Sequence, residues 1–429
     1  MRKVVALALV MFLPPVAAVD LIQVYDMALE NDPQLRAAKS TRDSTAEARP
    51  QAIAKLLPKV TGSGTATRTE RNTPSANYEY DSTELTATLT QPLLHFEYWM
   101  SLSKARYTTA KADADYSAAE LNLILRVAQV YFNILSSQDS LKFAESERKA
   151  ISRQLDQAKQ RFDVGLIAVT DVHEAQAAFD QARANEITAQ NDVESAWEAL
   201  REIVAELPGN QINGLRESLP LSKPDPADID QWTDAAMQQN YSIIAAMNNT
   251  QAARKNISVK ASGHLPTLDA VGTRSRTTTE YSASTDADIS TIGLQLQVPI
   301  FAGGEVMSQT RQARYDYQTA SEQLEQARRS VRRKVSDAYR GVVSSISKVK
   351  AYKAATVSAQ SALDATQAGF EVGTRTIVDV LDAQRNLYRA RRDYARARYD
   401  YIVNGLSLKE AAGILKPDDL QLVNALLTQ

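Results

Sequence analysis

The sequence contains no cysteine, which excludes a thiolate metal site, a cysteine nucleophile and a lipidated N-terminal cysteine. An oxidising compartment is allowed by this absence but not indicated by it. Glycine supplies only 15 residues and aromatic residues 7% of the chain, a composition that favours long helices over a large β domain. Neither sign of charge dominates, because 49 lysines and arginines are balanced by 51 aspartates and glutamates. The basic face that nucleic-acid binding usually needs is therefore not predicted.

Long hydrophobic runs are also missing from most of the chain. Beyond residue 18, no stretch approaches the roughly 20 apolar residues of a membrane-spanning helix. Residues 4–13 form a short apolar run that follows Met-Arg-Lys and precedes Val16-Ala17-Ala18. Because so short a run does not span ~30 Å of hydrocarbon, a signal peptide over residues 1–18 is favoured over a transmembrane anchor. Any crossing of a membrane must then use strands.

Signatures of catalysis are absent as well. The sequence has no Gly-rich phosphate loop, no nucleophile elbow and no Ser-His-Asp signature. Its three histidines, His95, His173 and His264, are far apart in sequence and predict no converging metal ligands. We therefore expect no enzyme activity, no bound cofactor and no metal site.

The chain contains one sequence unit that occurs twice. A shift of 208 residues places residues 57–58 on 265–266 and residues 162–165 on 370–373, with the same or closely similar side chains. This period is much longer than that of solenoid repeats, so it indicates a duplicated domain. The predicted repeats are residues 19–225 and 226–429, joined near the proline-rich stretch 219–226.

Both repeats begin with a helix, expected over residues 21–56 and 229–263. Asp20 and Asp228 are suited to cap the starts of these helices. Pro58 ends the first of them, because proline lacks the backbone N–H that a helix interior requires.

A change from helical to two-residue periodicity follows. Residues 83–91 and 292–298 alternate apolar with polar side chains, so one hairpin per repeat is expected, at about residues 59–92 and 267–300. Such hairpins either form the wall of a membrane β-barrel or pack as soluble hairpins on the helices, and the pattern supports both equally. The first strand of each hairpin is expected at 60–71 and 268–277, and the polar loops at 72–82 and 278–288.

A very long helix follows each hairpin. From Ala313 to Val349, small and apolar residues recur with a mean step of 3.6 residues, the helical period. Proline is absent from residues 93–165 and 303–369, which leaves room for a rod of about 60 residues and about 90 Å. A rod of this length must pack along others. Each rod ends at a Val-Gly turn, after which a second helix is expected to return. The turns are predicted at about residues 163–170 and 370–376, and the returning helices over about 170–207 and 376–415.

Four strands per chain cannot close a barrel, and an unpaired strand edge in lipid costs several kcal/mol per backbone group. If the strands lie in a membrane, chains must assemble until their edges meet. Three chains give twelve strands and four give sixteen, and the strand pattern does not choose between them. The competing interpretation is a secreted or periplasmic coiled-coil scaffold with soluble hairpin caps, which differs in not inserting into a membrane.

Five segments carry a resemblance to a known family. They are residues 153–157, 160–166, 170–172, 263–269 and 372–383, of which the last is very specific. With the duplication, they resemble the TolC family of outer-membrane efflux ducts over essentially the whole mature chain. The resemblance implies a mainly helical fold with transmembrane β structure: a homotrimer with a twelve-stranded β-barrel that continues into a twelve-helix tunnel. It also implies the outer membrane of a Gram-negative bacterium, with a periplasmic helical portion.

The resemblance further implies a function and partners. Members of the family are passive exit ducts for drugs and exported proteins, in tripartite efflux pumps and type I secretion systems. They lie among outer-membrane lipids and dock with a periplasmic adaptor protein and an inner-membrane RND pump or ABC exporter. Because nothing in the sequence binds nucleotide, the energy for transport must come from such partners.

Two aspartates near the second turn match the aspartate selectivity rings of the family. Asp379 and Asp382 stand three residues apart, just inside a helix start that Thr376 is suited to cap. Helix capping alone would explain them. If the tip lines a pore in a trimer, however, six carboxylates meet at one constriction and attract cations.

Other residues match the family's closed periplasmic gate. Gln154, Thr170, Asp171 and Arg375 correspond to residues that tie the entrance together, although ordinary surface pairs worth about 0–1 kcal/mol are the simpler explanation. Two positions depart from the family pattern, because Phe370 replaces an expected tyrosine and Gln367 an expected glutamate. We therefore expect a gate that opens more readily, or one held by other pairs, such as one with Glu174. Tip residues expected to contact the adaptor are Val164, Gly165, Leu166, Val372, Gly373 and Thr374.

An aromatic cluster follows the first hairpin. His95, Phe96, Tyr98 and Trp99 stand where a strand would leave the bilayer. Such a cluster is typical of an interfacial anchor, and packing at the junction of strands and helices is an equally good explanation.

Overall fold

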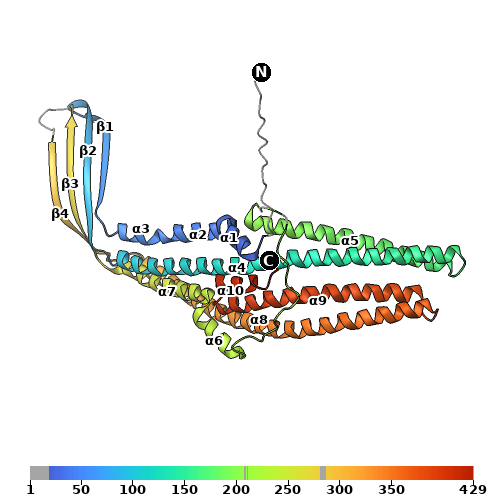
Figure 1. Cartoon of the computed structure of the whole chain (residues 1–429). Helices are drawn as coiled ribbons and strands as arrows, with labels where there is room; N and C mark the ends of the chain where they lie inside the picture. Colours follow the sequence, from blue (N-terminus) through green and yellow to red (C-terminus); the bar gives the residue numbers. More distant parts are fainter. Residues whose placement is uncertain (1–18, 207–208, 210, 281–286, 429) are drawn as a thin grey trace, which may run out of the picture. The chain divides into compact units, whose positions relative to one another are not determined.

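A computed structural model describes residues 19–206, 209, 211–280 and 287–428 of the chain. Its residues cluster into two compact units, both drawn in Figure 1. The first unit falls within Met1–Ala37, Ala119–Asn240 and Val331–Gln429, and the second comprises Ala38–Ala118 and Tyr241–Ser330. The expected signal peptide, residues 1–18, lies outside the described residues and stays a prediction.

The first helix expected in each repeat is broken into shorter helices. Residues 21–56 form α1 (Leu21–Asn31), α2 (Pro33–Ala46) and α3 (Ala48–Ala54). The expectation of one continuous helix was therefore wrong, because Pro33 lacks a backbone N–H and forces the residue before it out of the helical region. In the second repeat the pieces are α6 (Ile229–Gln239), α7 (Tyr241–Ala261) and a short 3-10 turn, η1 (Ser262–His264).

Both expected helix caps are present. The Asp20 carboxylate accepts a hydrogen bond from the Gln23 amide at 2.8 Å, and Asp228 accepts one from the Asp230 amide at 3.0 Å. Each satisfies a backbone donor that the first turn of a helix leaves without a partner.

Buried polar residues mark the two breaks. Asp32, which is 1% exposed, accepts hydrogen bonds from the backbone of α2 and pairs with Arg126. At the second break, the Asn240 side-chain amide donates to the Ala411 carbonyl at 2.9 Å, where Gly413 closes the end of a later helix in the left-handed conformation. Each break is therefore held by tertiary hydrogen bonds as well as by the local sequence.

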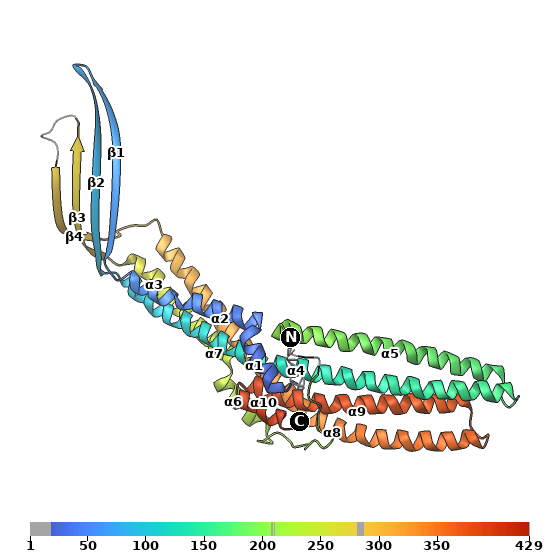
Figure 2. The same cartoon turned by 45° about the horizontal axis from the view of Figure 1, so that its top comes forward.

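The strands form one antiparallel sheet in the order β1-β2-β3-β4, shown at the upper left of Figure 2. They are β1 (Lys59–Thr73), β2 (Ala76–Leu94), β3 (Thr267–Thr279) and β4 (Ala287–Gln297). The expected loop over 72–82 was wrong, because backbone pairing continues to Thr73↔Ala76 and leaves a tight turn. Of the other expected loop, 278–288, residues 281–286 lie outside the described part, and the flanking residues are mostly strand.

The register gives the sheet two chemically different faces. Paired residues of neighbouring strands point to the same face, and successive residues alternate between the faces. One face, the hydroxyl face, presents Thr61, Ser63, Thr86, Thr88, Thr273, Ser275 and Thr291. The opposite, apolar face presents Val60, Leu85, Leu89, Ile292, Leu294 and Leu296, which are between 46% and 94% exposed in the single chain.

Two long helical hairpins complete the chain. The rods are α4 (Phe96–Asp163) and α8 (Glu305–Glu371), and the returning helices are α5 (Val169–Val204) and α9 (Ile377–Ala412). In the first unit their tip ends run side by side in both views (Figures 1 and 2). Helix α5 buries an alanine at every seventh position from 175 to 196, which lets a neighbouring helix approach closely. In the described part of the chain, no helix is long and apolar enough to cross a membrane.

A short final helix, α10 (Pro417–Asn424), was not predicted. It follows the left-handed turn at Gly413 and begins with a proline, a typical helix start. Near it, the Trp232 indole donates to the Pro226 carbonyl at 2.7 Å, which fixes part of the expected linker 219–226. That linker contains no helix or strand.

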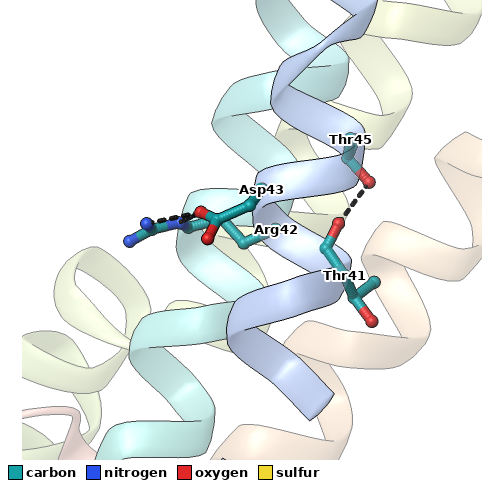
Figure 3. Close-up of polar contacts among 4 residues, drawn as sticks. All are labelled: Thr41, Arg42, Asp43 and Thr45. Atoms are coloured by element: carbon teal, nitrogen blue, oxygen red, sulfur yellow. Dashed lines mark hydrogen bonds and ion pairs between the residues drawn. The ribbon is translucent and has the colours of Figure 1, made fainter. Parts of the chain in front are cut away.

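Arg42 of α2 makes a contact with α4 within the second unit, and Figure 3 shows the polar contacts around it on α2. Arg42 pairs with Asp43 at 2.6 Å, and its guanidinium also lies 4.7 Å from the ring centre of Tyr116 on α4. One turn along, the Thr45 hydroxyl donates to the Thr41 carbonyl at 2.8 Å. Because a cation over an aromatic ring is attracted to it, Arg42 supplies attraction between the two helices.

The aromatic cluster at the start of α4 contains an unexpected hydrogen bond. His95 Nε2 lies 2.9 Å from Asp269 Oδ1, and the imidazole stacks on Tyr98 with ring centres 4.5 Å apart. Phe96 and Trp99 remain 41% and 55% exposed. His95 and Tyr98 therefore pack at the junction of strands and helix, whereas Phe96 and Trp99 keep the exposure that an interfacial anchor needs.

Candidate functional site

The two helical hairpins of the first unit end in tips of the same construction. In the first tip, the amides of Gly165 and Leu166 donate to the carbonyls of Phe162 and Arg161, each at 2.8 Å. Glycine is required at the turn because its φ is +75°, which other residues adopt only with strain. The second tip repeats this pattern with the amides of Gly373, at φ +80°, and Thr374.

The side chains at the tips are apolar and exposed. Val164, Leu166 and Val372 are 69%, 72% and 76% exposed. Within one chain these side chains gain nothing from hydrophobic burial, so the tips are suited to pack against another protein.

Asp379 lies at the start of α9 in a capping box with Thr376. Its carboxylate accepts hydrogen bonds from the backbone amide and the hydroxyl of Thr376, both at 2.9 Å, and the Thr376 hydroxyl accepts one from the Asp379 amide at 3.3 Å. These bonds, with a smaller contribution from the charge of Arg375, lower the pKa of Asp379 below its ordinary value. The expected capping by Thr376 is thus confirmed, and the carboxylate stays charged to a lower pH than usual.

Asp382 lies one turn further along α9 and is exposed. Its carboxylate pairs with Arg385 on the same helix face. A cation that approaches Asp382 therefore competes with a guanidinium, whereas one that approaches Asp379 meets a carboxylate without an ion-pair partner among the described residues.

The other predicted gate residues are not joined to one another in a single chain. Among the described residues, no hydrogen bond or ion pair links the side chains of Gln154, Thr170, Asp171 and Arg375, and Gln367 is simply exposed. Gln154 is only 5% exposed, and its side-chain carbonyl has no hydrogen-bond partner. Within the described part of one chain, these residues therefore form no network with one another.

Phe370 makes contacts that the sequence did not reveal. Its ring packs against two buried clusters, one that includes Leu155 and Leu381 and another that includes Val380. Above the ring, the Arg161 guanidinium lies 4.6 Å from its centre. This cation–π contact connects the tip of the first hairpin to that of the second.

Arg161 is a site residue that sequence reasoning missed. It belongs to a segment that resembles the family, yet a pairing partner 209 positions away could not be inferred from spacing. The signal that could have found it is an arginine beside the first tip together with an aromatic residue at the second.

In the part of the chain that the structure describes, no group of three His, Asp or Glu side chains is placed to hold a metal ion. The candidate site consists of the charged and the exposed apolar side chains at the tips of the two helical hairpins.

Comparison with known proteins gives the family. The model of the outer membrane efflux protein family matches residues 24–206 and, a second time, residues 232–414. The chain belongs to this family. Its two matched segments reflect the duplication that the 208-residue shift predicted.

Individual members of the outer membrane efflux protein family are similar over nearly the whole length. The chain is 41% identical to the outer membrane protein TolC of Vibrio cholerae, over 95% of this chain and 94% of that protein. It is 38% identical to TolC of Escherichia coli, over 96% of this chain and 86% of that protein. Its fold matches the Campylobacter jejuni CmeC outer membrane channel with a TM-score of 0.83 at 17% identity, over 95% of this chain and 89% of that one.

These findings confirm the predicted resemblance, fold class and location. The protein is an outer-membrane efflux channel component with a helical periplasmic portion. Its family consists of channel proteins, and efflux is its function.

Proposed function

We propose that three copies of this chain assemble into one channel. The observation that carries the proposal is a sheet whose outer strands, β1 and β4, each have an unpaired edge, and whose two faces are hydroxylic and apolar. In a trimer these edges pair between chains, so that twelve strands enclose a hydroxyl-lined pore and turn the apolar face to lipid. The helices continue the pore into the periplasm as a tunnel.

The duct carries solutes that a separate pump drives. An adaptor protein contacts the exposed tip residues Val164, Leu166 and Val372, and an inner-membrane RND pump or ABC exporter supplies the energy. Relatives named alkaline protease secretion protein AprF and outer membrane efflux protein BepC, at 29% and 26% identity, support both protein secretion and efflux as uses of this channel type.

The constriction at the tips is a cation-binding gate. Asp379 and Asp382 of three chains supply six carboxylates, and Arg375, Asp171, Thr170 and Gln154 hold the closed form through contacts between chains.

Assembly and conduction test the proposal directly. The purified mature protein is expected to run as a heat-sensitive trimer on gels, to fractionate with outer membrane and to give discrete, cation-preferring conductance steps in a planar bilayer. A monomeric protein that stays in water and conducts nothing would refute the proposal.

The gate also predicts an effect of Phe370→Tyr. The added hydroxyl can donate to a gate carboxylate, and a hydrogen bond to a charged group contributes about 1.5–3 kcal/mol, enough to favour the closed form by about tenfold or more. Single-channel conductance in a planar bilayer is therefore expected to fall. The matched control is Phe162→Tyr, since Phe162 is the equivalent residue of the first repeat and is 42% exposed. Equal conductance of the Phe370→Tyr variant and the wild type would contradict the expectation.

A further inference from the structure

Arg274 and Arg276 of β3 stand on the apolar face of the sheet, which also carries Arg68 and Asp288. The register places Arg274 and Arg276 of β3 on the same face as Leu85 and Ile292. Both side chains are exposed. Arg274 has only a loose partner, with 3.8 Å between its Nη2 and Asp288 Oδ2, and Arg276 has no ion-pair partner among the described residues. The pair therefore carries net positive charge even after Asp288 is counted.

A hollow lies beside these arginines. It has a volume of about 530 Å³ and is bordered by Gly62 and Gly64 of β1, Leu85 of β2, both arginines and Asp288 of β4. The two glycines keep it open, since a Cβ added at Gly62 would meet nothing within 4 Å and one at Gly64 would press on Leu85 at 3.1 Å. The hollow is thus lined by backbone, small side chains and Leu85, and its charged groups are two guanidinium groups and one carboxylate, which leaves a net positive charge.

The position of the arginines along the strands suits a membrane interface. They follow Leu268 on the same face of β3 by six and eight residues, or by about 15 and 20 Å along the barrel axis for tilted strands. Leu268 lies near the strand ends that lead to the helices, so on a roughly 25 Å apolar band that begins there Arg276 lies near the outer boundary and Arg274 closer to the middle. A charge costs about 0–1 kcal/mol near the boundary and about 2–4 kcal/mol at mid-membrane, so Arg274 depends more than Arg276 on a nearby anionic group.

We propose that Arg274 and Arg276 form a binding site for the phosphate of an anionic lipid of the outer leaflet. Guanidinium groups bind phosphate oxygens through paired, charge-assisted hydrogen bonds. The apolar residues on the periplasmic side of the same face, such as Leu89 and Ile292, then contact the acyl chains. The site rests on the proposed function, because a lipid reaches this face only if the face is the outside of the barrel.

Lipid binding to the purified trimer tests the site. Native mass spectrometry compares bis-phosphorylated lipid A with the same lipid after removal of its phosphates. The phosphorylated lipid is expected to bind the wild type more tightly. The R274Q/R276Q variant is expected to lose about 30-fold in affinity for it, and either single variant about fivefold, since an arginine near a charged lipid surface contributes about 1 kcal/mol.

Matched variants separate this site from general charge effects. Arg68 lies on the same face but pairs with Glu79 at 2.8 Å, so R68Q is expected to leave lipid affinity unchanged. R274K/R276K keeps the charge without the planar fork and is expected to retain part of the affinity.

Three outcomes would overturn the site. The first is equal affinity of the wild type and R274Q/R276Q for phosphorylated lipid A, the second is an equal loss in R68Q, and the third is altered ion selectivity of the pore with unchanged lipid affinity, which would place the arginines in the lumen. The conductance of the wild-type trimer is measured in parallel. If the wild type does not insert and conduct, the proposed function fails; if it conducts but shows one of the three outcomes above, only the lipid site fails.

Discussion

A channel in which Asp379 and Asp382 are both replaced by alanine is expected to lose its block by polyvalent cations and most of its cation preference. In the proposed trimer, the variant lacks six carboxylates at one constriction. Each carboxylate contributes about 1 kcal/mol to a cation at ~4 Å even in bulk water, so the affinity of a trivalent blocker should fall by about a thousandfold or more. Planar-bilayer titration with a trivalent cation measures this effect.

The structure predicts that the two aspartates contribute unequally to the block by polyvalent cations. Because Arg385 pairs with Asp382, removal of Asp379 should weaken block more than removal of Asp382. Asparagine is the cleaner substitution at 379, since its side-chain carbonyl can still accept from Thr376 and preserve the start of α9. The control is Asp337→Asn, an exposed carboxylate in the middle of α8 and far from the tip, which should leave the block by polyvalent cations intact. Retention of block in the double variant would refute a gate at these residues.

The block of conductance by polyvalent cations should also persist to unusually low pH. The pKa of Asp379 is lowered by its hydrogen bonds to Thr376, so the carboxylate keeps its charge as pH falls through the ordinary carboxyl range. Protonation, and with it the loss of block, then occurs only at a lower pH. Thr376→Val removes the hydroxyl bond and should move the loss of block to higher pH, as block measured between pH 7 and 3 would record. Identical pH profiles of the two proteins would contradict this.

Gly413→Ala is expected to destabilise the first unit by about 3 kcal/mol or more. Gly413 has a φ of +75°, and an added Cβ would lie 2.7 Å from the Gln239 carbonyl oxygen and 2.8 Å from Asn240 Cα. Both atoms are backbone, so no side chain can move aside, and the contact between α6 and the end of α9 must open. A lower temperature of trimer dissociation and a reduced yield of folded trimer would register the change.

The matched control lies in the same helix. Gly405 of α9 has no neighbour within 4 Å of an added Cβ and no positive φ. Because glycine costs about 0.5–1 kcal/mol in a helix interior relative to alanine, Gly405→Ala should be neutral or slightly stabilising. Equal stability of both variants would show that the contact at Gly413 does not limit folding.

Several elements could be predicted because their causes are local. The caps at Asp20, Asp228 and Thr376 require only the residues of one turn, and the long rods require only helical periodicity without proline. Two local signals were misjudged. Pro33 does break a helix, and the polar stretch 72–82 continues as strand because paired neighbours override weak propensity.

The site could be predicted only in part. Positions of Asp379, Asp382 and the tip glycines follow from the motif at the start of α9 and from the repeat. The stacking of Arg161 on Phe370, the burial of Gln154 and the pairing of Asp382 with Arg385 depend on which helix faces pack together. Spacing along the chain carries no information about such contacts.

By itself, the sequence determined the duplication, the helical rods, the alternating strands and the family to which the chain belongs, since each depends on periodicity or on residues close together in the chain. Only the tertiary structure decided how β2 and β3 pair across the two repeats. That pairing places Arg274 and Arg276 on the apolar face beside Gly62 and Gly64. The physical reason is that the facing of a strand is fixed by its register with a neighbour, and the neighbours here come from segments far apart in the chain.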